Sequence, residues 1–209
     1  IVLGALIAGR LSKAHIETGL VPVGAIGVAA GLFLVPQLEL IWAQVLGFVA
    51  IGMFGSLFLV PLNALIQFHA GEKGLGRVLA ASNFVQNTVM LAFLGLTVAA
   101  SLAAVGGKAI LTALAVIAAG GAVYTLIKLP QSLVRFIIDR LISARYRLEV
   151  VGLRNLPSQG GVLMLGNHIS WLDWAMVQMA SPRPVRFVMI RGIYERWYLK
   201  WFLDYFGVV

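Results

Sequence analysis

The sequence has no cysteine and few charged residues. The absence of cysteine excludes disulfides, a cysteine nucleophile and thiolate metal sites within these 209 residues. Only 11% of the residues are Asp, Glu, Lys or Arg, and 60% are hydrophobic. Soluble domains carry about 25% charged residues. The chain therefore cannot be soluble throughout, and we expect a large part of it to lie in a membrane.

The few charges are unevenly placed. The net charge is +8, yet only five of the sixteen Lys and Arg residues precede Lys128. This shift in composition predicts a transmembrane domain over residues 1–128, a linker over 129–147 and a second domain over 148–209. The first eight residues are apolar and do not begin with Met. They are typical of the end of a helix, and we expect the chain to be a fragment at both ends.

Four uncharged stretches are long enough to cross a membrane, which takes about 20 apolar residues. They cover residues 18–38, 40–71, 78–107 and 109–127. Buried helices of a soluble core are the alternative, but four consecutive runs of this length favour membrane spans. The Lys and Arg residues between the spans gather in the loops 10–17 and 71–77 and after Lys128. The positive-inside rule places these loops and the second domain in the cytoplasm, and hence the chain in the inner membrane as a multi-pass protein.

Some polar residues lie inside these spans. Asn63 is near the end of the second span, and Asn83, Gln86 and Asn87 share one face of the third with Ser82. Uncharged amides in a membrane either line a substrate path or form hydrogen bonds between helices. The sequence leaves both interpretations open, and the four amides are the candidate transport-path residues.

The linker has the pattern of an amphipathic helix from Pro130 to about Arg147. A polar stripe of Arg135, Asp139, Ser143 and Arg147 faces away from an apolar stripe. A basic amphipathic helix beside a membrane span is typical of the headgroup layer, and we expect it to lie there. Packing on the second domain is the alternative.

The second domain alternates between strand and helix patterns. Short strands are predicted at 147–151, 162–165 and 185–190, with helices at about 171–179 and 194–206. This order predicts a truncated α/β domain. The last helix has one aromatic face, which suits either a core or a membrane interface and consists of Tyr194, Trp197, Tyr198, Trp201, Phe202 and Tyr205.

The membrane part resembles the major facilitator superfamily. The segment from Gly4 to Lys13 is similar to its cytoplasmic loop motif, although Gly9 replaces the usual acidic residue. The segments 8–12, 19–22 and 76–83 resemble lysophospholipid transporters of that superfamily. The resemblance implies that residues 1–128 are the last helices of a major-facilitator-type α-helical transmembrane bundle.

The second domain resembles the lysophosphatidate acyltransferase family, which comprises glycerophospholipid acyltransferases. Asn167, His168 and, after four further residues, Asp173 match its first motif, between similar flanking segments at 150–157 and 185–190. The resemblance implies that His168 is the catalytic base and that Asp173 orients it. Taken alone, without the family resemblance, Asp173 is better explained as a helix cap and His168 as a core histidine. Asn167, Ser170 and Arg191 are the candidate substrate-binding residues, and Ser170 suits an N-cap better than a nucleophile.

Together these patterns predict a lysophospholipid transporter fused to an acyltransferase. The acyl group would pass from acyl-CoA or an acyl-carrier protein to a hydroxyl of a lysophospholipid or lysophosphatidate, without an acyl-enzyme, a metal or another cofactor. Membrane lipids are expected partners and nucleic acids are not. One alternative is a transporter whose appended domain only binds lipid, and another is an unrelated membrane anchor on a lysophosphatidate acyltransferase. The family's second and third motifs are expected beyond Val209, so we expect these 209 residues alone to be inactive.

Overall fold

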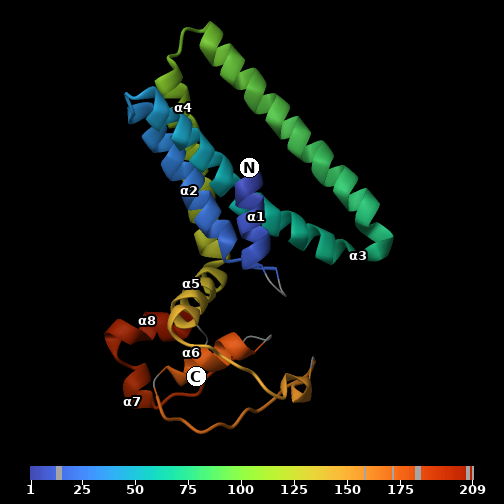
Figure 1. Ribbon diagram of the computed structural model, residues 1–209, viewed down its shortest axis with the longest axis vertical. Helices are drawn as coiled ribbons and strands as arrows, with labels where there is room; N and C mark the ends of the chain where they lie inside the picture. Colours follow the sequence, from blue (N-terminus) through green and yellow to red (C-terminus); the bar gives the residue numbers. More distant parts are fainter. Residues whose placement is uncertain (13–15, 158, 171, 182–184, 206–207, 209) are drawn as a thin grey trace. The chain divides into compact units, whose positions relative to one another are not determined.

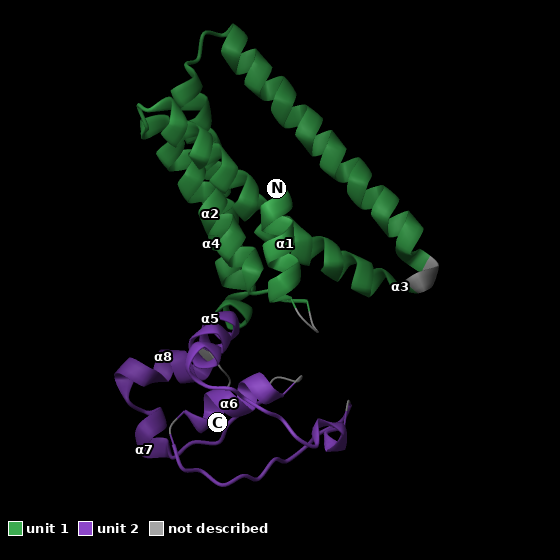
Figure 2. Ribbon diagram, viewed as in Figure 1, with its two compact units in different colours: residues 1–133 green, residues 134–209 purple. Residues whose placement is uncertain are grey.

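The computed structural model describes residues 1–12, 16–157, 159–170, 172–181, 185–205 and 208 (Figure 1). The chain divides into two compact units, residues 1–133 and residues 134–209 (Figure 2). The boundary lies inside one helix of the predicted linker. Each unit has its own packing and is described separately.

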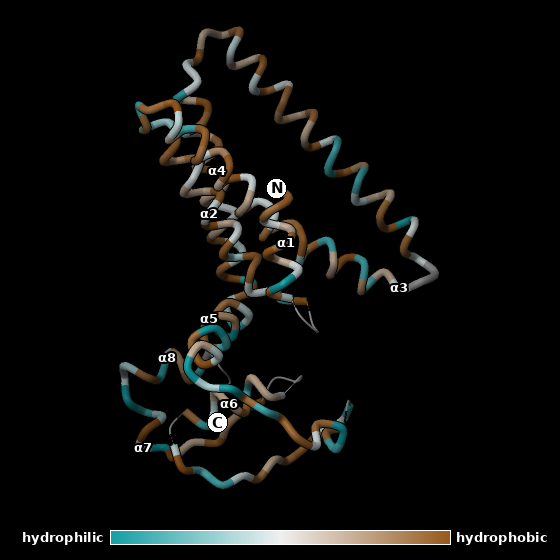
Figure 3. Tube along the Cα trace, in the orientation of Figure 1, coloured by the Kyte–Doolittle hydropathy of each residue, from teal (hydrophilic) through white to brown (hydrophobic). Residues whose placement is uncertain are grey.

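The first unit consists of helices of membrane length. After the short α1 (Val2–Leu11) come α2 (Leu20–Leu34) with the 3-10 turn η1 (Val35–Gln37), α3 (Ile41–Leu102) and α4 (Gly107–Lys128). Four segments are long and apolar enough to cross a membrane, namely Leu20–Gln37, Ile41–Gly71, Gly74–Leu102 and Gly107–Lys128. They coincide with the four predicted spans, which are thereby confirmed. Figure 3 shows apolar colour along most of their length.

The reversal between the second and third spans is sharper than the sequence suggested. A loop was expected over 71–77, but helix resumes directly after Gly71, the one non-helical residue inside α3. Gly71 has a φ of +61°, which glycine adopts without the steric penalty of a side chain. Residues 72–77 are helical although Gly74 and Gly76 are among them and glycine is a poor helix former. They extend the helix of the third span instead of forming a loop.

Small residues let the helices of the first unit approach closely. Helix α2 packs against α3 and α4, and α1 packs against α3. A methyl group on Gly24 of α2 would lie 2.5 Å from the backbone nitrogen of Phe58 on α3. Large apolar side chains such as Trp42, which is 75% exposed, point outward instead. Small residues between helices and large ones outside are the arrangement expected of a bundle surrounded by lipid.

The second unit is helical wherever regular structure is assigned. It contains most of α5 (Pro130–Arg145), the 3-10 turn η2 (Leu153–Asn155), α6 (Asp173–Ala180), α7 (Arg191–Tyr194) and α8 (Trp197–Tyr205). Helix α5 confirms the predicted linker helix. On it, Ile142 is buried while Leu141 is 67% exposed, so only part of the predicted apolar face packs within the unit.

The predicted strands are not confirmed. Among the described residues no β-strand is assigned, and the segments 147–151, 162–165 and 185–190 have no regular structure. A strand is stabilised by ladder hydrogen bonds to a neighbour, and a two-stranded pair alone is marginal in water. Apolar side chains in these segments remain uncovered, since Leu165 is 88% and Val188 87% exposed. The α/β character of residues 148–209 therefore stays a prediction.

The last predicted helix, at about 194–206, is observed as α8 at Trp197–Tyr205, and its predicted end at residue 206 lies outside the described residues. Tyr194 instead ends α7, and a turn at Glu195 and Arg196 separates α7 from α8, so that the predicted aromatic face is interrupted. On α8, Phe202 packs edge-on against Trp174 of α6, with ring centroids 6.1 Å apart. Trp197 is 86% and Trp201 70% exposed. One side of α8 thus belongs to the core of this unit, and the other side is open.

Candidate active site

The two residues predicted to be catalytic lie together at the start of α6. His168 is in the irregular segment that follows residues 162–165, and Asp173 is the first residue of the helix. The Nδ1 atom of His168 lies 3.1 Å from Oδ2 of Asp173, within hydrogen-bonding distance. The four-residue spacing in the sequence therefore corresponds to a direct contact between the two side chains.

The same carboxylate oxygen also holds the turn. The backbone N–H groups of Ile169 and Ser170 donate to Oδ2 of Asp173 at 2.7 and 2.8 Å. The N–H of Ser170, followed by that of Ile169, lowers the pKa of the Asp173 carboxyl below its ordinary value of 3.8. Hydrogen bonds donated to the charged form have this effect. Asp173 is therefore an ionised carboxylate that both closes the turn and contacts the imidazole.

The imidazole of His168 is accessible. Its side chain is 75% exposed, whereas that of Asp173 is 29% exposed. Because Nδ1 faces the carboxylate, Nε2 is the ring nitrogen that a substrate can reach. A carboxylate that accepts from Nδ1–H fixes the tautomer in which Nε2 carries a lone pair. The pair thus has the arrangement of an oriented general base.

The neighbouring predicted residues have different surroundings. The hydroxyl of Ser170 accepts a hydrogen bond from the N–H of Leu172 at 3.3 Å, as a residue that shapes the turn would. Asn167 is exposed beside His168. Trp171, where the helix was expected to begin, lies outside the described residues. A helix-cap role of Asp173 was one interpretation of the sequence, and the hydrogen bond from the N–H of Ser170 agrees with it. The second donor, the N–H of Ile169, was not predicted, since no side-chain pattern marks it.

Arg191 is engaged on its own helix. Its Nε donates to Oε1 of Glu195 at 2.7 Å, one turn further along, and its side chain is 87% exposed. An exposed pair of this kind contributes little to stability and separates easily. The structure therefore places Arg191 at the surface in an ion pair with Glu195, and its predicted contact with substrate stays a prediction.

The four candidate transport-path amides are not gathered around one cavity. Asn63 is half-buried on the second span, and Asn83, Gln86 and Asn87 are exposed on the third. The side chain of Gln86 donates to the Ser82 hydroxyl at 2.9 Å along the same helix. An open groove of about 420 Å³ in this unit is lined by α2 and α4 and by none of the four amides. Both interpretations of these residues remain open.

Within the described ranges, no group of three or more His, Cys, Asp or Glu side chains is placed to hold a metal ion. The His168 and Asp173 pair can supply acid–base chemistry at the turn.

Comparison with known proteins agrees with both halves of this description. The model of the Acyltransferase family matches residues 147–209, which include His168 and Asp173. The lysophospholipid transporter LplT of Photorhabdus laumondii is 38% identical over 98 residues, which are 46% of this chain and 24% of that protein. The LplT proteins of Escherichia fergusonii and Serratia proteamaculans are 39% and 40% identical over the same length. No solved structure matches the chain.

The chain spans about a quarter of the length of the transporters, 24% in each of these cases. Its four spans and its similarity to transporters nevertheless identify a multi-pass membrane protein. The chain therefore combines an acyltransferase-family segment at residues 147–209 with membrane helices and a similarity to lysophospholipid transporters.

Proposed function

We propose that the protein transfers a fatty acyl group from a thioester donor to the free hydroxyl of a lysophospholipid. The observation that carries this proposal is the His168–Asp173 pair, 3.1 Å apart, inside the segment that matches the Acyltransferase family. A lysophospholipid acceptor is supported by the similarity to lysophospholipid transporters. Lysophosphatidate is the smallest acceptor of this chemical class.

The reaction uses His168 first as a base and then as an acid. Nε2 accepts the proton of the acceptor hydroxyl while its oxygen attacks the thioester carbonyl. The tetrahedral intermediate then expels the thiolate, which takes the proton back from the imidazolium. Asp173 stabilises the imidazolium in between and holds the ring. The hydroxyl is itself the nucleophile, so the reaction forms one ester, releases one thiol and needs no acyl-enzyme.

The donor is acyl-CoA or an acyl-carrier protein, and the residues described require no further cofactor for this step. We propose that residues 1–128 belong to a lysophospholipid transporter of the major facilitator type, fused to the acyltransferase. In that arrangement the protein lies in the inner membrane with residues 148–209 in the cytoplasm, where thioester donors are made. The transporter part would bring its lipid to the leaflet in which the acyltransferase works.

The test is acyl transfer by the full-length protein in membranes, measured with radiolabelled acyl-CoA and lysophospholipid. We expect His168→Ala to lower the rate about a hundredfold or more, the scale of a lost general base. His69→Ala is the matched control, because His69 is an exposed histidine on α3 whose Nδ1 contacts only its own helix at the Leu65 carbonyl. It should leave the rate unchanged. Full activity in His168→Ala would refute the proposed function of this site.

A second function is favoured by the transporter similarity itself: lysolipid transport with a C-terminal domain that only binds lipid. The same preparation distinguishes the two. Uptake of radiolabelled lysophospholipid into vesicles, with no acylation of it from either donor class, would support the second function against the first.

A further inference from the structure

Helix α6 carries Asp173 at its first residue and ends at Ala180, with Ser181 as its C-cap. The carbonyl groups at a helix C-terminus carry partial negative charge and have no partner within the helix. Many helices place a basic residue in their last turn, which offsets this charge. Helix α6 has no basic residue there. No cation within the helix therefore offsets this charge.

Arg135 of α5 supplies a cation. Its Nη2 donates to the backbone carbonyl of Ser181 at 2.9 Å, across 46 residues of sequence. Ser181 is buried, with 4% of its surface exposed, and Arg135 is half-buried. A charge-assisted hydrogen bond that is partly shielded from water is stronger than one at an open surface. Arg135 thus caps α6 at the end opposite to Asp173.

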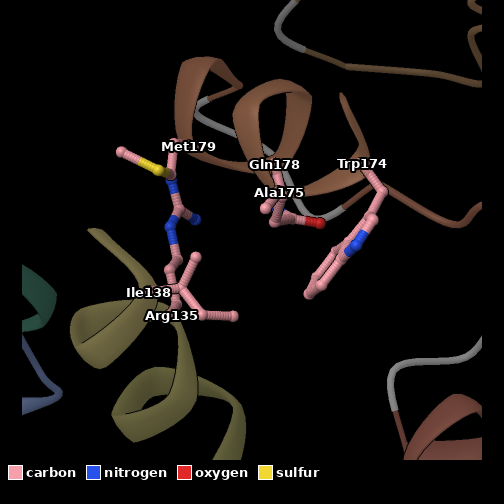
Figure 4. A pocket seen from close by; sticks show the side chains of 6 residues that line it. All are labelled: Arg135, Ile138, Trp174, Ala175, Gln178 and Met179. Atoms are coloured by element: carbon pink, nitrogen blue, oxygen red, sulfur yellow. The ribbon is translucent and has the colours of Figure 1, made fainter. Parts of the chain in front are cut away.

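The capping contact is part of a close packing of α5 on α6. A cavity of only about 10 Å³, roughly one water molecule, is left between the two helices. Figure 4 shows the Arg135 side chain extending from α5 toward α6 beside Met179, with Ile138 next to it. Ala175 on α6 is 2% exposed, which leaves no room for a shift of the helix without loss of packing.

Two further contacts hold α6 from its other neighbours. The N–H of Val185 donates to the side-chain oxygen of Gln178 at 3.1 Å. Trp174 packs against Phe202 of α8. Among these contacts, only that of Arg135 brings a full positive charge to the C-terminal end of the helix. It is therefore the contact whose loss most directly loosens the end of α6.

We propose that Arg135 is a positioning residue for the His168–Asp173 pair and acts through α6. It fixes the helix whose first residue orients the base. This inference rests on the proposed function, because it predicts an effect on acyl transfer. It differs from the role that the polar stripe of α5 suggested, in which Arg135 would bind lipid headgroups.

The experiment compares Arg135→Gln, Arg135→Lys and Arg145→Gln in the full-length protein in membranes. We expect Arg135→Gln to lower kcat about tenfold, the upper range for a lost cation at a partly buried helix C-terminus, with KM for lysophospholipid within about twofold. Arg135→Lys keeps the charge and should stay within about threefold of wild type. Arg145, at the exposed end of the same helix, stacks on Tyr146, and its substitution should change neither constant.

Each outcome decides the question. An unchanged kcat in Arg135→Gln, or a raised KM with kcat preserved, would overturn the proposal, and the second result would indicate headgroup binding. Arg135→Lys no better than Arg135→Gln would overturn the electrostatic argument. If Arg135→Gln fails to accumulate, hydrogen exchange of the α6 amides in Arg135→Lys decides: protection close to wild type is expected because the charge is kept, and a large loss of protection would overturn the electrostatic argument. His168→Ala is assayed in parallel to test the proposed function separately. If the proposed function is wrong, His168→Ala keeps full activity; if only the role of Arg135 is wrong, His168→Ala is inactive.

Discussion

Replacing Asp173 with asparagine separates the charge of this side chain from its hydrogen bonds. Oδ2 accepts from two backbone N–H groups and contacts Nδ1 of His168. An amide NH₂ cannot occupy that position, because it would face two donors, so the asparagine carbonyl must lie there. It still accepts from Nδ1–H and keeps the tautomer. Only the negative charge beside the imidazolium is lost.

The size of the effect follows from the distance. Nδ1 and Oδ2 are 3.1 Å apart. At that distance and at the dielectric constant of water, the attraction between two opposite unit charges changes an equilibrium constant about tenfold. Water is the right reference, because the His168 side chain is 75% exposed. We therefore expect Asp173→Asn to lower kcat about tenfold. Asp173→Ala removes the acceptor as well, and should lower it about a hundredfold, as His168→Ala does.

The assay is acyl transfer at equal amounts of membrane-inserted protein, with His168→Ala and the double variant His168→Ala/Asp173→Asn alongside. If the two residues act as a unit, the double variant should be as active as His168→Ala alone, with no further loss of rate from Asp173→Asn. Wild-type activity in Asp173→Asn would show that Asp173 only caps the helix. Activity as low as that of His168→Ala would show that the amide does not preserve the tautomer. Either result would refute the reasoning.

Three other predictions concern pH, packing and topology. Because the pKa of Asp173 is lowered below its ordinary value of 3.8, its carboxylate stays ionised on mild acidification, and its contribution disappears only as the pH falls through the lowered value. The pH–rate profiles of the wild type and Asp173→Asn should therefore fall together on mild acidification, and a fall in the wild type alone would contradict this. Gly24→Ala should lower the stability of the purified protein in detergent by about 1–3 kcal/mol, because its methyl group meets the Phe58 backbone. Gly95→Ala is the control and should not lower it, because no described atom lies within 4 Å of the added methyl group. Equal melting temperatures of the two variants would contradict this packing. In the cysteine-free chain, a single cysteine at Asn155 should resist membrane-impermeant labelling of intact cells, and strong labelling would reverse the proposed orientation.

The membrane helices were predictable because their signal is local. A run of about 20 apolar residues is sufficient evidence for a span, and each of the four runs can be found without knowledge of the others. The predicted strands depend on partners far away in the sequence. For the segment around Leu165, an apolar run of four residues indicates a strand only if a neighbour pairs with it. The break at Glu195 is likewise invisible in a periodicity that continues across it.

The candidate site was also predictable only where its signal is local. The spacing of His168 and Asp173 indicated a contact, since both lie near one helix start. That a single oxygen serves the base and two backbone donors is a matter of backbone geometry, which residue identities do not specify. The contact between Arg135 and the Ser181 carbonyl joins segments 46 residues apart, and one of its partners is a backbone group. The polar stripe marked Arg135 as facing a polar environment, without indicating which one.

The position of Gly71 has a consequence for how the second and third spans fit a bilayer. The apolar helix before it has 31 residues, and the one that follows has 29. At 1.5 Å per residue these helices are about 46 and 43 Å long, well above a hydrocarbon thickness of about 30 Å. Fitting them by tilt alone would take about 45–50°, beyond the usual range of about 0–40°. Part of each helix therefore extends into the headgroup region. The sequence favours the end at Gly71, because the charged Glu72 and Lys73 follow it directly, and there water can satisfy the backbone groups that the reversal leaves without helical partners.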